Sequence, residues 1–147
     1  MLYERERIEW SNFWWEEANK ECKRILLVGD SVTRGYRSLL NIFFEEYDYA
    51  VDLCAFSASI TNTLTEKMLK CFFSISEYSY ELVGIQLGGQ HGFRKLCCTD
   101  SEQRERFKQA YLKYVLEIKS KCRKVFLVSY TPTVLKENLD LYNRLQK

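Results

Sequence analysis

The chain has 147 residues, of which 46% are hydrophobic, enough for one compact domain with a sizeable core and too few for two. Its 22 basic and 20 acidic side chains leave a net charge of +2, which gives no large field for attracting nucleic acid or an anionic membrane. The start of the chain, MLYERERIEW, lacks the apolar run of a signal peptide, and no stretch approaches the length of a membrane span. We therefore expect one cytoplasmic domain, residues 1–147, with no nucleic-acid or membrane partner.

The amino-terminal segment before the first expected strand is rich in tryptophan. Residues 9–21, EWSNFWWEEANKE, fit a helix that places Trp10 and Trp14 one turn apart. We expect a helix here, with both rings used for packing rather than for stacking on a sugar.

Four short apolar runs alternate with helical patterns along the middle of the chain. The runs predict strands at residues 24–28, 50–55, 82–87 and 124–130. Helices are expected at residues 32–46, 61–73 and 100–121, the last opened by the capping-box pattern Thr99-x-x-Glu102. This alternation favours right-handed crossovers, so we predict an α/β domain with an open parallel sheet of about four strands and helices on both faces. Ligands of such sheets bind beyond the carboxyl ends of the strands.

The chain ends on a further helical pattern. Leu135, Leu139 and Tyr142 recur at helical spacing, and no glycine cap or fifth strand follows. This ending indicates a domain that is incomplete at its carboxyl terminus. A sheet edge left open by a missing strand would promote self-association, so a homo-oligomer is expected as one outcome.

The cysteines and the single histidine do not form a metal-site pattern. The six cysteines contain no Cys-x-x-Cys, and one histidine is too few for a zinc site by spacing. In a reducing compartment we expect them to be small buried thiols, with the adjacent pair Cys97-Cys98 as a minor redox alternative. No metal is predicted.

The sequence Gly29-Asp30-Ser31 interrupts the first apolar run just before a helical pattern, and it has two interpretations. In the first, Asp30 or Ser31 caps the following helix and Gly29 permits the turn. In the second, Ser31 is a nucleophile at a helix N-terminus, where free N–H groups stabilise an oxyanion. The two interpretations are compatible. A phosphate-binding loop has little support, because GxxxxGK[ST] and GxGxxG are both absent, and the GxSxG elbow of α/β-hydrolases is absent too.

These residues carry a resemblance to a known family. LLVGDSVTRG, residues 26–35, resembles the first block of the SGNH or GDSL hydrolases, serine esterases and lipases whose nucleophile follows the first strand. The segments EWSNFWWEEAN, IQLGGQHG and VFLVSYTPT are similar to a bacterial branch of these proteins. The resemblance implies a three-layer flavodoxin-like fold, with Ser31 as the nucleophile.

The family's second and third blocks match unevenly, and they suggest the remaining site residues. In FSASI, residues 56–60, Ser59 lies near the position whose backbone N–H points at the oxyanion. In Gly89-Gln90-His91-Gly92, His91 occupies the position of the family's oxyanion asparagine, and a shift of one residue would place Gln90 there. The resemblance thus implies an oxyanion site of Ser31, Ser59 and His91. The expected pocket residues are Asp30, Arg34, Gly89 and Gln90.

The family's last block, Asp-x-x-His, is missing, and so the usual triad is incomplete. His91 is the one histidine of the sequence, and a serine without a base is a weak nucleophile. Three explanations stay open: a truncated esterase, a natural inactive relative, or a base role for His91. Of these three explanations, we expect the first, a truncated esterase.

The resulting prediction is a hydrolase of acetyl or short acyl esters on a carbohydrate or other small molecule, acting through Ser31 without a cofactor. The alternative from another class is an inactive SGNH-like binding or interaction module that lacks the general base. A weaker alternative is a flavodoxin-like phosphate or flavin binder that uses Ser31 and Thr33.

Overall fold

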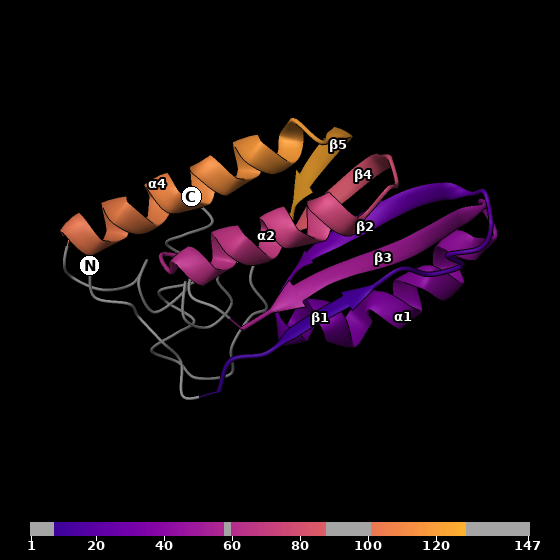
Figure 1. The fold of residues 1–147 in the computed structure, drawn as a ribbon, viewed down its shortest axis with the longest axis horizontal. Helices are drawn as coiled ribbons and strands as arrows, with labels where there is room; N and C mark the ends of the chain where they lie inside the picture. The colour runs from indigo at the N-terminus through magenta and orange to yellow at the C-terminus, as the bar shows by residue number, and fades with distance from the viewer. Residues whose placement is uncertain (1–7, 58–59, 88–100, 129–147) are drawn as a thin grey trace.

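The computed structural model describes residues 8–57, 60–87 and 101–128, and these form one mixed sheet with three helices (Figure 1). The strands, in chain order, are β1 (Ser11–Trp14), β2 (Lys23–Gly29), β3 (Tyr49–Phe56), β4 (Tyr80–Ile85) and β5 (Cys122–Leu127). The helices are α1 (Ser31–Glu45), α2 (Thr63–Ile75) and α4 (Ser101–Lys119). The α/β class and the alternation predicted from the sequence are confirmed.

The sheet has the order β1-β3-β2-β4-β5, with β2 at its centre. The four strands from β2 to β5 are mutually parallel, and Val28 of β2 is paired with Cys54 on one side and Ile85 on the other. Their carboxyl ends therefore lie at one edge of the sheet. Among the described strands β5 pairs with β4 alone, and self-association through its outer edge stays a prediction.

The expected helix over residues 9–21 is wrong, because this segment contains strand β1, which pairs antiparallel with β3. Phe13 and Trp15 pack on Phe72 of α2, and their ring centroids lie 5.3 and 5.2 Å, respectively, from that of Phe72. Trp14 points the opposite way and is 47% exposed. Pairing with β3 satisfies the backbone of this short aromatic segment, and these tertiary contacts outweigh its helical spacing.

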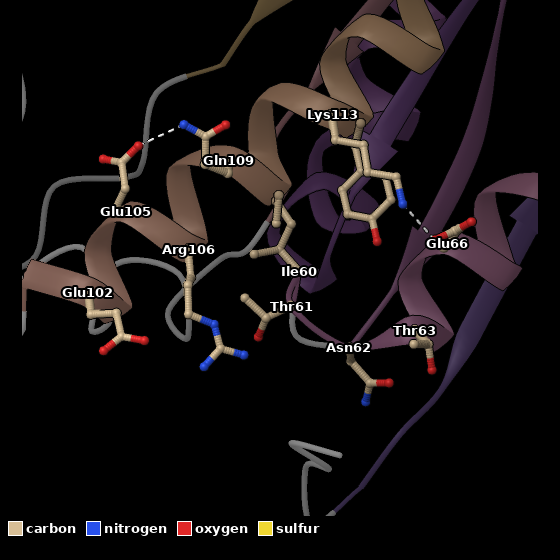
Figure 2. A pocket seen from close by; sticks show the side chains of 12 residues that line it. Ile60, Thr61, Asn62, Thr63, Glu66, Glu102, Glu105, Arg106, Gln109 and Lys113 are labelled. Atoms are coloured by element: carbon tan, nitrogen blue, oxygen red, sulfur yellow. Dashed lines mark hydrogen bonds and ion pairs between the residues drawn. The ribbon is translucent and has the colours of Figure 1, made fainter. Parts of the chain in front are cut away.

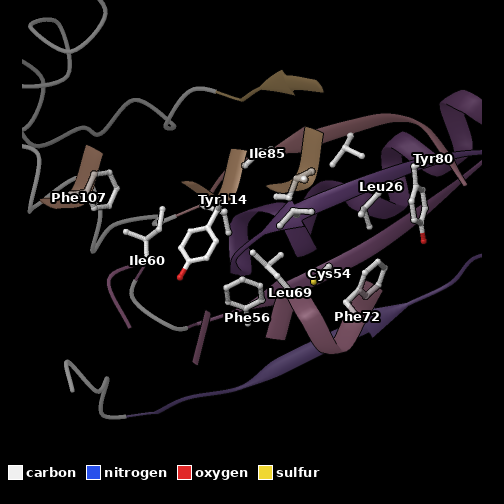
Figure 3. Close-up of a cluster of buried hydrophobic side chains, with 14 residues drawn as sticks. Leu26, Cys54, Phe56, Ile60, Leu69, Phe72, Tyr80, Ile85, Phe107 and Tyr114 are labelled. Carbon is white, nitrogen blue, oxygen red and sulfur yellow. The ribbon is translucent and has the colours of Figure 1, made fainter. Parts of the chain in front are cut away.

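Side chains of β2 alternate between two cores, as expected for a strand buried on both faces. Leu26 and Val28 join the core beneath α2 and α4 (Figure 3), whereas Ile25 and Leu27 join the core beneath α1. The helices thus cover both faces of the sheet, with α1 on one face and α2 and α4 on the other (Figure 1).

Some predictions at the ends of elements are corrected or lie outside the described ranges. The buried Asn62 caps α2 through a hydrogen bond from the Leu64 N–H to its side-chain oxygen (2.9 Å), so this helix begins later than expected. Thr99 of the capping-box pattern and the helical spacing at residues 135–142 lie outside the described residues. No helix within the described ranges is both long and apolar enough to span a bilayer.

Candidate functional site

The Gly29-Asp30-Ser31 turn joins the central strand to α1 at the carboxyl edge of the sheet. Asp30 has extended backbone angles (φ −121°, ψ −155°), and its Oδ1 accepts a hydrogen bond from the Val32 N–H at 2.9 Å. Asp30 is therefore the N-cap, and Ser31 is the first residue of the helix. This decides which of the two residues caps the helix.

The Ser31 side chain is exposed, and none of the described residues hydrogen-bonds its hydroxyl. It lies at the first turn of a 15-residue helix whose first turn has no acidic side chain. N–H groups of a first helical turn lack intrahelical partners and favour negative charge. The Asp30 carboxylate takes up the Val32 N–H and offsets part of this potential, so the turn presents the hydroxyl beside the remaining first-turn N–H groups, which can stabilise an oxyanion.

Gly29 is required by close packing rather than by an unusual backbone angle. A Cβ atom at this position would lie 2.7 Å from the Thr33 Cβ, 3.0 Å from the Gln86 carbonyl oxygen, and in collision with the Thr33 Oγ1. The missing side chain lets the first turn of α1 approach the ends of β2 and β4.

Gln86, directly after β4, was not singled out from the sequence. Its N–H donates to the Val28 carbonyl at 2.8 Å, and its buried side-chain Oε1 accepts from the Thr33 hydroxyl at 2.9 Å. The Tyr36 hydroxyl also donates to this oxygen, at 3.3 Å. The available sequence signal was a polar residue inside an apolar run, since Leu87 beyond it is buried again.

Arg34 follows the turn but is held against the amino-terminal segment. Its guanidinium lies over the Trp10 ring, 4.6 Å from the centroid. The backbone N–H of Trp10 donates to the Ser57 Oγ at 2.9 Å, and the backbone N–H of Ser57 donates to the Trp10 carbonyl at 3.1 Å. Of the expected pocket residues, Asp30 thus caps a helix and Arg34 stacks on an indole, both next to Ser31.

The other expected site residues, Ser59, Gly89, Gln90 and His91, lie outside the described residues. The structure does place the ends of the two strands that precede them in the chain, β3 at Phe56 and β4 at Ile85. Strands β3 and β4 lie on either side of β2, and the Gln86 N–H donates to the carbonyl of Val28, the residue before Gly29. The geometry of an oxyanion site therefore rests on Ser31 alone among the described residues.

A groove of about 450 Å³, lined by described residues, lies between the start of α2 and α4, and Ser31 does not line it (Figure 2). The Glu66 carboxylate in its wall accepts from Lys113 Nζ at 2.7 Å and from Lys70 Nζ, which does not line the groove, at 2.5 Å. These hydrogen bonds, with Lys113 the larger effect, lower the pKa of Glu66 to about 2. The groove walls are thus salt-bridged, and the groove is separate from the serine turn.

The described part of the chain holds no group of three or more histidine, cysteine, aspartate or glutamate side chains arranged for a metal. Its cysteines are free thiols. The expectation of buried thiols fits Cys54, whose pKa is raised by burial, but not the exposed Cys71. Cys97 and Cys98 are not among the described residues.

Comparison with known proteins adds no family to these observations. No protein-family model matches the chain, and a search of curated proteins finds no match. Any function must therefore be inferred from the residues themselves.

Proposed function

We propose that the chain is a serine hydrolase domain of the SGNH type, with Ser31 as the nucleophile for acetyl or short acyl esters. The observation that carries this proposal is the exposed Ser31 hydroxyl on the first turn of α1, with the capping role taken by Asp30. A serine used as the cap would have its oxygen engaged by the backbone, whereas the Ser31 hydroxyl has no partner among the residues that the structure describes.

The order of the parallel strands supports the finer assignment to a three-layer flavodoxin-like fold. Numbered along the chain, the four parallel strands are arranged as second, first, third and fourth. In sheets of this order the ligand crevice lies where the crossovers diverge from the first strand. Ser31 follows that strand.

In the proposed reaction the Ser31 Oγ attacks the acyl carbon, and a base accepts the hydroxyl proton. The oxyanion takes hydrogen bonds from the backbone N–H of Ser31 and from donors at Ser59 and His91. The leaving alcohol takes the proton from the base, and water then releases the acid from the acyl-enzyme. The base is a histidine outside this sequence, or else His91, the one histidine of the sequence, which then leaves the oxyanion to the donors at Ser31 and Ser59.

Fluorophosphonate labelling of the full 147-residue chain, with peptide mass spectrometry, tests this proposal. We expect one adduct on Ser31, none in Ser31→Ala, and normal labelling in Ser38→Ala, which removes an exposed hydroxyl from the same helix. Loss of labelling in both His91→Ala and His91→Asn would assign the base to His91, whereas labelling kept in His91→Asn, which retains a side-chain donor, would assign His91 to the oxyanion site. A folded wild-type chain without an adduct would contradict the proposal and favour the non-catalytic binding module.

A further inference from the structure

Three elements meet directly beneath the serine turn. They are the end of β2 at Gly29, the first turn of α1 at Thr33, and the residue after β4, Gln86. Thr33 is fully buried and Gln86 is 5% exposed, and the hydrogen bond between their side chains spans 53 positions in sequence. Tyr36 reaches the same amide oxygen from the next turn of α1.

The contact between Thr33 and Gln86 is polar although both side chains are buried. A buried hydroxyl or amide left without a partner costs about 1–3 kcal/mol, whereas two apolar side chains of the same shape pack almost as well. Further along α1, Arg37 donates to the Val51 carbonyl of β3 and Asn41 Oδ1 accepts from the Val51 N–H, at 2.9 Å each, and the other contacts of the helix with the sheet are apolar, through residues such as Leu40 and Phe44. Those bonds hold the middle of the helix to β3, whereas the hydrogen bond between the buried Thr33 and Gln86 fixes the position of its first turn at the end of β4.

Resting on the proposed function, we propose that Thr33, Tyr36 and Gln86 form a positioning cluster that fixes the Ser31 turn against the carboxyl end of β4. None of the three touches the reacting atoms. Their effect is on geometry: a displacement of about 1 Å at a nucleophile lowers a rate by up to about 100-fold. Gly29 belongs to the same arrangement, because any side chain there would push Thr33 away.

The test compares Thr33→Val with Thr33→Ser in the full chain. Valine keeps the volume and removes the donor, whereas serine keeps the hydroxyl and loses the methyl group. We expect the maximal rate of Ser31 labelling by fluorophosphonate to fall about tenfold in Thr33→Val, with the half-saturating probe concentration nearly unchanged. Thr33→Ser is expected to restore the rate to within about threefold of wild type.

A second readout does not depend on catalysis. We expect amide hydrogen exchange at residues 32–36 to accelerate in Thr33→Val, while exchange in β3 stays as in wild type. Tyr36→Phe, which removes the longer hydrogen bond, is expected to show a smaller effect in both measurements and also serves if Thr33→Val does not fold.

The outcomes separate the two proposals. Wild-type labelling with an unchanged rate in the folded variants would overturn the positioning cluster and leave the proposed function standing. Absence of wild-type labelling would reject the function, and hydrogen exchange would then decide whether the cluster holds the turn. Equal protection of residues 32–36 in wild type and Thr33→Val would overturn the cluster in either case.

Discussion

Two regions of the sheet carry polar side chains, and they use them differently. In the amino-terminal halves of β2 and β3, Arg24 and Asp52 are buried and paired, with Arg24 Nη1 at 2.9 Å from Asp52 Oδ1. Tyr80 donates to the same carboxylate at 3.1 Å, and the Arg24 guanidinium lies 3.6 Å from the Tyr78 ring centroid. At the carboxyl edge, Ser31 is exposed, and its hydroxyl has no partner among the described residues.

We call the first region the Arg24 cluster: Arg24, Asp52, Tyr78 and Tyr80. Its guanidinium also donates to the carbonyls of Glu16 and Glu17, at 2.9 and 3.1 Å, which ties the segment after β1 to the sheet. Burial raises the pKa of Asp52, and the Glu16 N–H and the Arg24 charge oppose this effect. The contrast teaches that burial and hydrogen bonding, rather than residue type, separate structural polar groups from those available for chemistry.

The largest effect on stability is expected from breaking the Arg24 cluster. Asp52→Leu leaves a buried guanidinium without its carboxylate, and we expect the free energy of unfolding to fall by about 3–5 kcal/mol. Urea denaturation measures the loss. The double variant Arg24→Met/Asp52→Leu is expected to recover much of it, because no buried charge is left. A loss in the double variant equal to the sum of the losses in Arg24→Met and Asp52→Leu would show that the two side chains are not coupled.

The next largest effect on stability is expected at Gly29 in the serine turn, and Gly35 in α1 allows a direct comparison. In Gly29→Ala the new methyl group meets Thr33 and Gln86, and we expect a loss of about 1–3 kcal/mol in unfolding free energy. Gly35→Ala is the matched control, because a Cβ atom there has no neighbour within 4 Å. At this helical position alanine is expected to stabilise by about 0.5–1 kcal/mol. Equal effects of the two substitutions would argue against the close packing at Gly29.

A smaller, pH-dependent effect is expected from the exposed ion pairs of Glu66, which link α2 to Lys113 of α4. Its pKa is lowered from 4.5 to about 2, so the folded state binds fewer protons than the unfolded state between these values. The stabilisation is therefore complete above about pH 4.5 and is lost as the pH falls toward 2. Glu66→Gln is expected to cost about 0.5 kcal/mol at pH 7, less in high salt. A difference from wild type that persists at pH 2 would contradict the ion-pair explanation.

The smallest effect on stability is expected at the proposed nucleophile itself. Ser31→Ala removes an exposed hydroxyl with no described partner, so the free energy of unfolding should stay within about 0.5 kcal/mol of wild type. Thermal denaturation beside the labelling experiment measures both properties on one sample. A large loss of stability would mean that the hydroxyl has a structural role, which would remove the contrast with the Arg24 cluster.

Local sequence determined most of the fold. The apolar runs predicted all four parallel strands, and helical periodicity predicted the three described helices, because both patterns depend on neighbours within a few residues. The Gly29-Asp30-Ser31 turn was recognisable for the same reason. A strand that ends in glycine and small polar residues before a helical pattern is a short-range signal.

Tertiary structure alone decided the remaining features. Residues 9–21 have helical spacing, yet pairing with β3 makes Ser11–Trp14 a strand. Thr33 and Gln86 lie 53 residues apart, and Arg24 and Asp52 lie 28 apart, so no local pattern reveals either contact. The sequence offered both Asp30 and Ser31 as caps, and only the backbone angles of the folded turn assign the role to Asp30. Periodicity records which face of an element is buried, but the partner on that face depends on chain segments that meet only after folding.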